Sequence, residues 1–196
     1  MGGKFYILYI LAKVYFNAVL RIIKNTIIMF FGKTKLGTKI SCPVKLKKEN
    51  FTFQKKFAKI FIKYDECKNC VYHCCHSRIN RFDFVDCYLQ GFTLKQGISP
   101  MHKISHILPS VADIIYRMYR FQEKQLPREN CFYYSSSVGC LLPIGSRPNM
   151  CIAGVCYNLL RKFNENDLRN YSSLLNQYIF FHTKCFFYLF EELKKR

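Results

Sequence analysis

Apolar residues fill most of positions 5–31, and the polar residues among them recur at helical intervals. Lys13, Asn17, Arg21 and Lys24 fall on one narrow stripe of a helix, while Ile, Leu, Val, Phe and Tyr cover the rest of its surface. No window of about 20 residues here is both apolar and uncharged, which argues against a membrane span. The pattern predicts either a basic amphipathic helix in the plane of a membrane or a helix buried in the core.

A second long helix is predicted from about residue 166 to residue 195, where apolar residues recur at three- and four-residue intervals. Aromatic residues extend beyond one face of it, at Phe180, Phe181, Phe187 and Phe190. We therefore expect this helix to pack on two sides, against the N-terminal helix, or to contact a partner or a bilayer. Its predicted core stripe is Leu168, Tyr171, Leu175, Tyr178, Cys185, Phe186 and Leu189.

The pattern between these helices is less regular. Residues 32–50 hold two Gly, a Pro and many Lys, which favours a loop or linker, and partial alternation over 57–64 predicts a short strand. Ser110 is a predicted N-cap for a helix through Phe121, and a further helix is predicted to begin near Cys156.

We therefore predict a mainly α fold: a small irregular cysteine-rich core with flanking helices and one or two short strands. Residues 1–50 would form the N-terminal helix and linker, 51–163 the cysteine domain, and 164–196 a helix that packs on the same core.

The formal charge of +19, from 31 Lys and Arg against 12 Asp and Glu, favours anionic partners. No recognition-helix or RNP-like pattern accompanies it, so binding to nucleic acid would be nonspecific. An anionic membrane surface, contacted through residues 5–31, is an alternative, and a protein partner is another. Lys13 interrupts the first apolar run and no A-x-A cleavage site follows, so we expect the cytoplasm, or the inner face of the membrane.

Four thiols lie within nine residues, at Cys67, Cys70, Cys74 and Cys75. The C-x-x-C spacing lets one turn bring two sulfurs to a single ion, and the first three cysteines would share one face of a helix. Clustered cysteines in a reducing compartment indicate metal binding or redox chemistry, with disulfide pairing as the alternative. Cys42, beside Pro43, has no cysteine neighbour and is assigned no function.

A second group comprises Cys131, Cys140, Cys151 and Cys156, among turn residues. Eight thiols could form two closed four-ligand zinc sites or one bridged pair, and iron–sulfur clusters also take four Cys each. The candidate cofactor is therefore iron, including an iron–sulfur cluster, or zinc. Nearby basic residues that could offset thiolate charge are Lys68, Arg78 and Arg147, the last being equally consistent with an exposed loop residue.

These residues resemble the CxxCxxCC (YkgJ-type) family of zinc- or iron-chelating proteins, whose relatives include the flagellin lysine N-methylase. The first motif corresponds to Cys67, Cys70, Cys74 and Cys75, with three residues rather than two before the third cysteine. The second corresponds to the run 139–143, the run 147–151 and Cys156, preceded by Cys131. The resemblance covers residues 67–156 and implies a metal site. It also raises protein lysine N-methylation as an alternative function.

The remaining polar residues suggest little chemistry. His102 and His106 have i, i+4 spacing, but Lys103 stands where a zincin needs its Glu. His73 and His76 flank the first cysteines and are alternative ligands to Cys75. The shared helix face of His182 and Cys185 is best explained by ordinary packing, and Asp83 and Asp86 are interpreted as solvated turn residues.

Overall fold

The computed structural model describes residues 3–32, 39–64, 83–92, 134–135, 139–140, 142–155 and 157–195. Its helices are α1 (Gly3–Gly32), α2 (Val44–Phe61), α3 (Phe84–Gln90), α6 (Asn149–Ala153), α7 (Tyr157–Leu160) and α8 (Glu165–Lys194). Two short strands, β1 (Tyr134–Ser135) and β2 (Gly139–Cys140), pair antiparallel, with Tyr134 opposite Cys140 and Ser135 opposite Gly139. The predicted mainly α fold is confirmed.

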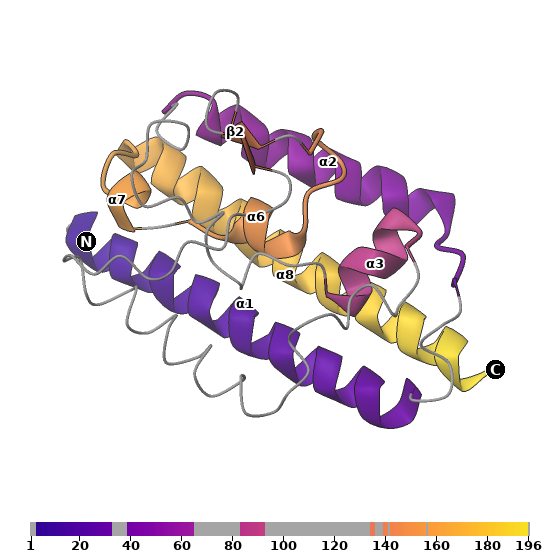
Figure 1. Cartoon of the computed structure of the whole chain (residues 1–196). Helices are drawn as coiled ribbons and strands as arrows, with labels where there is room; N and C mark the ends of the chain where they lie inside the picture. Colours follow the sequence, from indigo (N-terminus) through magenta and orange to yellow (C-terminus); the bar gives the residue numbers. More distant parts are fainter. Residues whose placement is uncertain are drawn as a thin grey trace.

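Helix α8 lies between α1 and α2 and also packs against α3, so it is the centre of the core (Figure 1). Its start is fixed by Asn164, whose side chain accepts a hydrogen bond from the backbone N–H of Asp167 at 2.8 Å, as an N-cap does. The helix predicted from residue 166 is therefore confirmed. Every residue of the predicted core stripe is buried: Leu168, Tyr171, Leu175, Tyr178, Cys185, Phe186 and Leu189.

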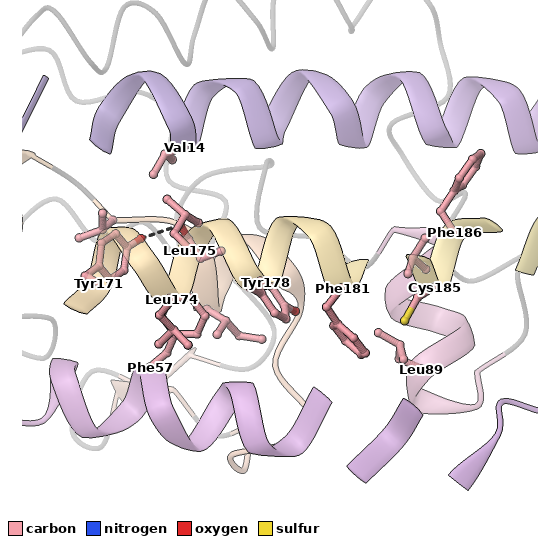
Figure 2. Close-up of a cluster of buried hydrophobic side chains, with 14 of the residues drawn as sticks. Val14, Phe57, Leu89, Tyr171, Leu174, Leu175, Tyr178, Phe181, Cys185 and Phe186 are labelled. Atoms are coloured by element: carbon pink, nitrogen blue, oxygen red, sulfur yellow. Dashed lines mark hydrogen bonds between the residues drawn. The ribbon is translucent and has the colours of Figure 1, made fainter. Parts of the chain in front are cut away.

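The two sides of α8 bury apolar residues against different helices, as predicted. Val14 of α1 lies above Leu175, and Phe186 points toward the same helix (Figure 2). On the other side, the ring centroid of Phe57 in α2 lies 5.6 Å from those of Tyr171 and Tyr178 in edge-on contacts. Phe180 and Phe187 remain exposed to solvent.

The strand predicted over 57–64 is wrong, because these residues continue α2 to Phe61 and then form a turn. Phe57, Ile60 and Phe61 have the spacing of one helix face, and Lys59, which lies between them in the sequence, is exposed. The loop predicted over 32–50 also ends early, because α2 begins at Val44. The predicted helix near Cys156 is present as α7, and the one predicted after Ser110 lies outside the described residues.

The turn after α2 is tied to the start of α8. Asp167, although a carboxylate, is buried, and it accepts hydrogen bonds from Lys63 Nζ and from the Tyr64 hydroxyl, both at 2.7 Å. The ring of Tyr64 stacks on that of Phe163 with centroids 4.5 Å apart. These contacts fix one end of the α2–α8 pair.

Candidate functional site

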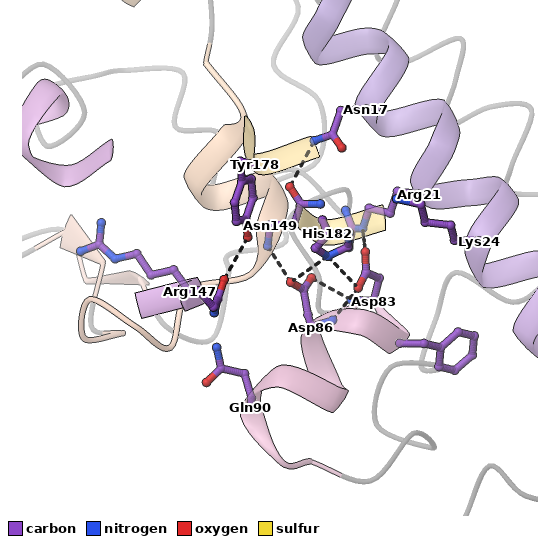
Figure 3. A network of polar contacts seen from close by, with 12 residues as sticks. Asn17, Arg21, Lys24, Asp83, Asp86, Gln90, Arg147, Asn149, Tyr178 and His182 are labelled. Atoms are coloured by element: carbon purple, nitrogen blue, oxygen red, sulfur yellow. Dashed lines mark hydrogen bonds and ion pairs between the residues drawn. The ribbon is translucent and has the colours of Figure 1, made fainter. Parts of the chain in front are cut away.

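A buried polar cluster lies where α1, α3, α6 and α8 meet (Figure 3). It begins with Asp83, the N-cap of α3, whose Oδ1 accepts a hydrogen bond from the Asp86 backbone N–H at 2.7 Å. Asp86 Oδ2 in turn accepts one from the Asp83 backbone N–H at 3.1 Å, completing a capping box. The spacing D-x-x-D therefore places two carboxylates at the start of one short helix.

Both carboxylates are buried, at 1% and 3% exposure for Asp83 and Asp86. The prediction that they are solvated turn residues is therefore wrong. The reason is long-range: Arg21 Nε of α1 donates to Asp83 Oδ2 at 3.0 Å, and the Asn149 backbone N–H of α6 donates to Asp86 Oδ1 at 2.9 Å. The N-capping pattern is visible in the sequence, whereas these partners, distant along the chain, are not.

His182 of α8 completes the cluster. Its side chain is fully buried, and its Nε2 lies 3.7 Å from Asp83 Oδ1 and 3.7 Å from Asp86 Oδ1. Neither ring nitrogen has a hydrogen-bond partner among the described residues. Ordinary apolar packing, the explanation favoured from sequence, is therefore incomplete, because this histidine faces two carboxylates.

The two carboxylates are electrostatically different. Burial raises the pKa of Asp83, but electrostatic interactions with the neighbouring His182 and Arg21 outweigh it, so that this pKa lies below its usual value. Burial and the neighbouring Asp83 raise the pKa of Asp86. Burial also lowers the pKa of Lys24, which donates to the Thr183 hydroxyl at 2.8 Å, to about 8.

A neighbouring set of polar side chains holds the segment Leu142–Asn149, which lies between Cys140 and Cys151. Gln54 of α2 accepts hydrogen bonds from the backbone N–H groups of Gly145 and Arg147, at 2.7 and 3.3 Å, and donates to the Arg147 carbonyl at 3.0 Å. The side chain of Gln90 in α3 donates to the Gly145 carbonyl at 2.9 Å. Two helices therefore fix this backbone by direct side-chain contacts.

Glycine is required at the centre of this segment. Gly145 has φ 104°, which non-glycine residues rarely adopt, and a Cβ there would stand 2.5 Å from Cδ2 of Phe51. At its end, the Asn149 side chain accepts a hydrogen bond from Asn17 Nδ2 of α1 at 3.1 Å. The Arg147 guanidinium donates to the Leu142 carbonyl at 3.2 Å, and so helps to close the turn.

The structure describes few of the predicted metal ligands. Cys67, Cys70, Cys74, Cys75, Cys131 and Cys156 lie outside the described residues, as do Lys68 and Arg78. Cys140 is placed in β2 by its backbone, and Cys151 lies half-buried in α6, directly after the fixed segment. By contrast Cys42, Cys87 and Cys185 are buried in the hydrophobic core.

The outer face of α1 is a second candidate site. Among the α1 side chains that the structure describes, the large exposed ones are all apolar, while Asn17, Arg21 and Lys24 are buried against the core. Lys13 is directed to Ser172 of α8, with its Nζ 2.9 Å from the hydroxyl. The predicted polar stripe is thus real but faces inward. The exposed residues are Phe5, Leu8, Tyr9, Phe16, Ile23 and Phe30.

The stretch Phe5–Ile28 is long and apolar enough to span a membrane, a criterion that core helices and N-terminal signals also meet. Its contacts favour another arrangement, because Arg21 contacts Asp83, the N-cap of α3, and Lys24 contacts Thr183 of α8. A helix bound lengthwise to a polar cluster presents only its opposite face to a membrane.

Comparison with known proteins leaves the chain without an assigned family. No family model, curated protein or solved structure matches it. The resemblance to the YkgJ-type proteins therefore rests on the cysteine and Arg-Pro motifs of the sequence.

Proposed function

We propose that this protein binds a metal ion, iron or zinc, through thiolates of its two cysteine groups. The observation that carries the proposal is the way in which Gln54 and Gln90 hold the backbone of Gly145 and Arg147. A buried polar side chain such as Gln54 is costly unless it is paired, and here Gln54, with the half-buried Gln90, fixes the backbone of residues 145–147, which lie between Cys140 and Cys151. Such a rigid connection suits a pair of ligands that must keep a defined separation.

The donor chemistry supports the same proposal. Thiolates favour zinc and iron–sulfur clusters over harder ions, and eight of the 11 cysteines belong to the two groups. Cys151 is half-buried beside the fixed turn, a position from which a thiolate can face a bound ion. When bound, the metal would supply folding energy to the cysteine segments.

The test is the metal content and visible absorbance of the anaerobically purified full-length protein. Brown protein with absorbance in the visible region indicates an iron–sulfur cluster, and colourless protein with stoichiometric zinc indicates a zinc site. We expect Cys70→Ser to release the metal and Cys42→Ser, the matched substitution of a core thiol, to retain it. Wild-type protein without stoichiometric iron or zinc, or equal loss in both variants, would contradict the proposal.

The outer face of α1 favours a second role, docking on an anionic membrane surface, on the cytoplasmic side. Phe16 and Ile23 are 56% and 48% exposed, and burial of such residues among lipid chains is favourable. The net charge of +19 would attract the protein to anionic headgroups.

Vesicle cosedimentation tests this second role. Deletion of α1 would remove part of the core, so substitutions on its outer face are the sharper experiment. We expect Phe16→Ser with Ile23→Ser to abolish binding to vesicles containing phosphatidylserine and to leave folding intact. The control is Val44→Ser with Ile62→Ser, which alters exposed apolar residues of α2 and its C-cap. Equal binding by both double variants would exclude α1 as the docking surface.

A further inference from the structure

We propose that Asp83, Asp86 and His182 form a second metal site, separate from the thiolates, that binds a divalent first-row cation such as Mn²⁺. Two carboxylates and an imidazole are donors that suit this class of ion. The three side chains come from the start of α3 and from the middle of α8, so the packing of these helices creates the site (Figure 3).

The spacing of the donor atoms supports a shared ion. Nε2 of His182 lies 3.7 Å from Oδ1 of each aspartate, beyond the usual length of about 3.2 Å for a direct N–H···O hydrogen bond. Two neighbouring ligand atoms, each about 2.1 Å from an octahedrally coordinated ion, lie about 3.0 Å apart. One ligand atom from each of the three residues lies within 4.8 Å of the others, so the three side chains must move closer together to share one ion.

The unsatisfied histidine is independent support. The side chain of His182 is fully buried, and neither of its ring nitrogens has a hydrogen-bond partner among the described residues. An unpaired buried polar group of this kind costs roughly 1–3 kcal/mol. A cation bound at Nε2 removes this cost for the nitrogen that faces the carboxylates.

The other contacts of the carboxylates leave room for an ion. Arg21 binds Oδ2 of Asp83, the oxygen not paired with His182, and so orients Oδ1 toward the histidine. Asp86 Oδ1 also accepts the Asn149 backbone N–H, and Oδ2 accepts that of Asp83. Each Oδ1 already accepts one hydrogen bond and has a second lone pair for a metal.

The surrounding charge is compatible with a divalent ion. Two carboxylates balance its charge, and Arg21 contributes one further positive charge. Lys24 is another nearby cation. Its Nζ is bound to Thr183 rather than to either carboxylate. The remaining neighbours, Tyr178, Cys87 and Cys185, are buried.

Mn²⁺ is the probe of choice because soft thiolates bind it poorly, so this test is separate from that of the cysteine site. The full-length protein is incubated overnight with Mn²⁺, since the cluster is buried, and bound ion is counted from loss of the free Mn²⁺ electron paramagnetic resonance signal. We expect one ion per chain and, at a hundredfold excess over Kd, a rise in Tm of about 5 °C.

The variants are His182→Gln and Asp86→Asn, with Asp167→Asn as a matched change of a buried aspartate elsewhere. We expect the first two to lose both the bound ion and the Tm rise, and Asp167→Asn to keep both, whatever its starting stability. Because each Tm rise is measured within one variant, loss of basal stability does not obscure it. The proposal is overturned if wild-type protein binds no Mn²⁺ at about 1 mM, which is the weakest Kd that we regard as useful. It is also overturned if His182→Gln binds Mn²⁺ as well as wild type does.

Discussion

The chain places cysteines in two contrasting regions. Cys87 and Cys185 are fully buried among apolar side chains of the α3–α8 contact, and burial raises the pKa of both thiols. Cys151 instead follows the turn that Gln54 and Gln90 hold, and it is half-buried. The core cysteines behave as small hydrophobic residues that resist ionisation, whereas a metal ligand must ionise.

This difference shows that the number of cysteines in a sequence does not measure its metal-binding capacity. Figure 2 shows Cys185 beside Leu89, within the apolar core. The segment before Cys151 is held by polar contacts that an apolar core does not need. The predictions below test whether the two regions can be perturbed separately.

The largest effect is expected at Gln54, which holds the turn. Gln54→Ala would leave the N–H groups of Gly145 and Arg147 and the Arg147 carbonyl without this partner. We expect a loss of about 3 kcal/mol in the free energy of unfolding, at about 1–3 kcal/mol for each unsatisfied buried group. Urea unfolding measures this loss, and hydrogen exchange should show faster exchange of both amides.

Gln177→Ala is the matched control, since Gln177 is exposed on α8 and, among the described residues, its side chain donates a hydrogen bond to Ser173, one turn away. We expect it to leave stability within about 0.5 kcal/mol of wild type. If Gln54→Ala were equally mild, the turn would not depend on α2.

A smaller effect is expected for Cys185→Ser in the core. A hydroxyl in place of this buried thiol should lower the free energy of unfolding by about 1–3 kcal/mol, because the substitution buries a more polar group without adding a hydrogen-bond partner for it. Thermal unfolding measures the change, and the metal content of the folded variant should equal that of wild type. Loss of metal from folded Cys185→Ser would remove the distinction between the two regions.

The smallest effect concerns pH at Cys42. Burial raises the pKa of this thiol to about 11, whereas in the unfolded chain it titrates near about 8.5. Between these values the unfolded state releases a proton that the native state keeps, so stability falls as pH rises. Cys42→Ala should make this fall in the free energy of unfolding less steep between roughly pH 9 and 11, the interval between the two pKa values. Urea unfolding at several pH values measures it. A slope unchanged from wild type would show that Cys42 is accessible to solvent.

The long helices were predictable because their apolar spacing is regular and local. In α8, His182 even stands in the core stripe, four residues after Tyr178 and three before Cys185, so its burial had a visible signal. Helix α2 was missed because its lysines alternate with apolar residues, and this alternation resembles the pattern of a strand. Local propensity and charge pattern are poor predictors of secondary structure where tertiary packing determines it.

The candidate site was harder to predict than the fold. Asp83 and Asp86 carry the signature of a helix N-terminus, which is normally exposed, and only Arg21, Asn149 and His182 make their burial possible. The inward direction of the α1 polar stripe depends on the same partners. Sequence separates a polar stripe from an apolar face, but it does not say which of them meets the core.

X-ray absorption at the metal edge tests the central claim most directly, because it identifies the atoms bound to the ion. For the anaerobically purified protein we predict sulfur neighbours at about 2.3 Å if the metal is zinc. An iron–sulfur cluster would show iron–sulfur and iron–iron scattering instead. Cys151→Ser should lose part of the sulfur signal, and Cys42→Ser should retain all of it. A spectrum with only oxygen and nitrogen neighbours, or one unchanged by Cys151→Ser, would contradict thiolate binding at the segment that the helices hold.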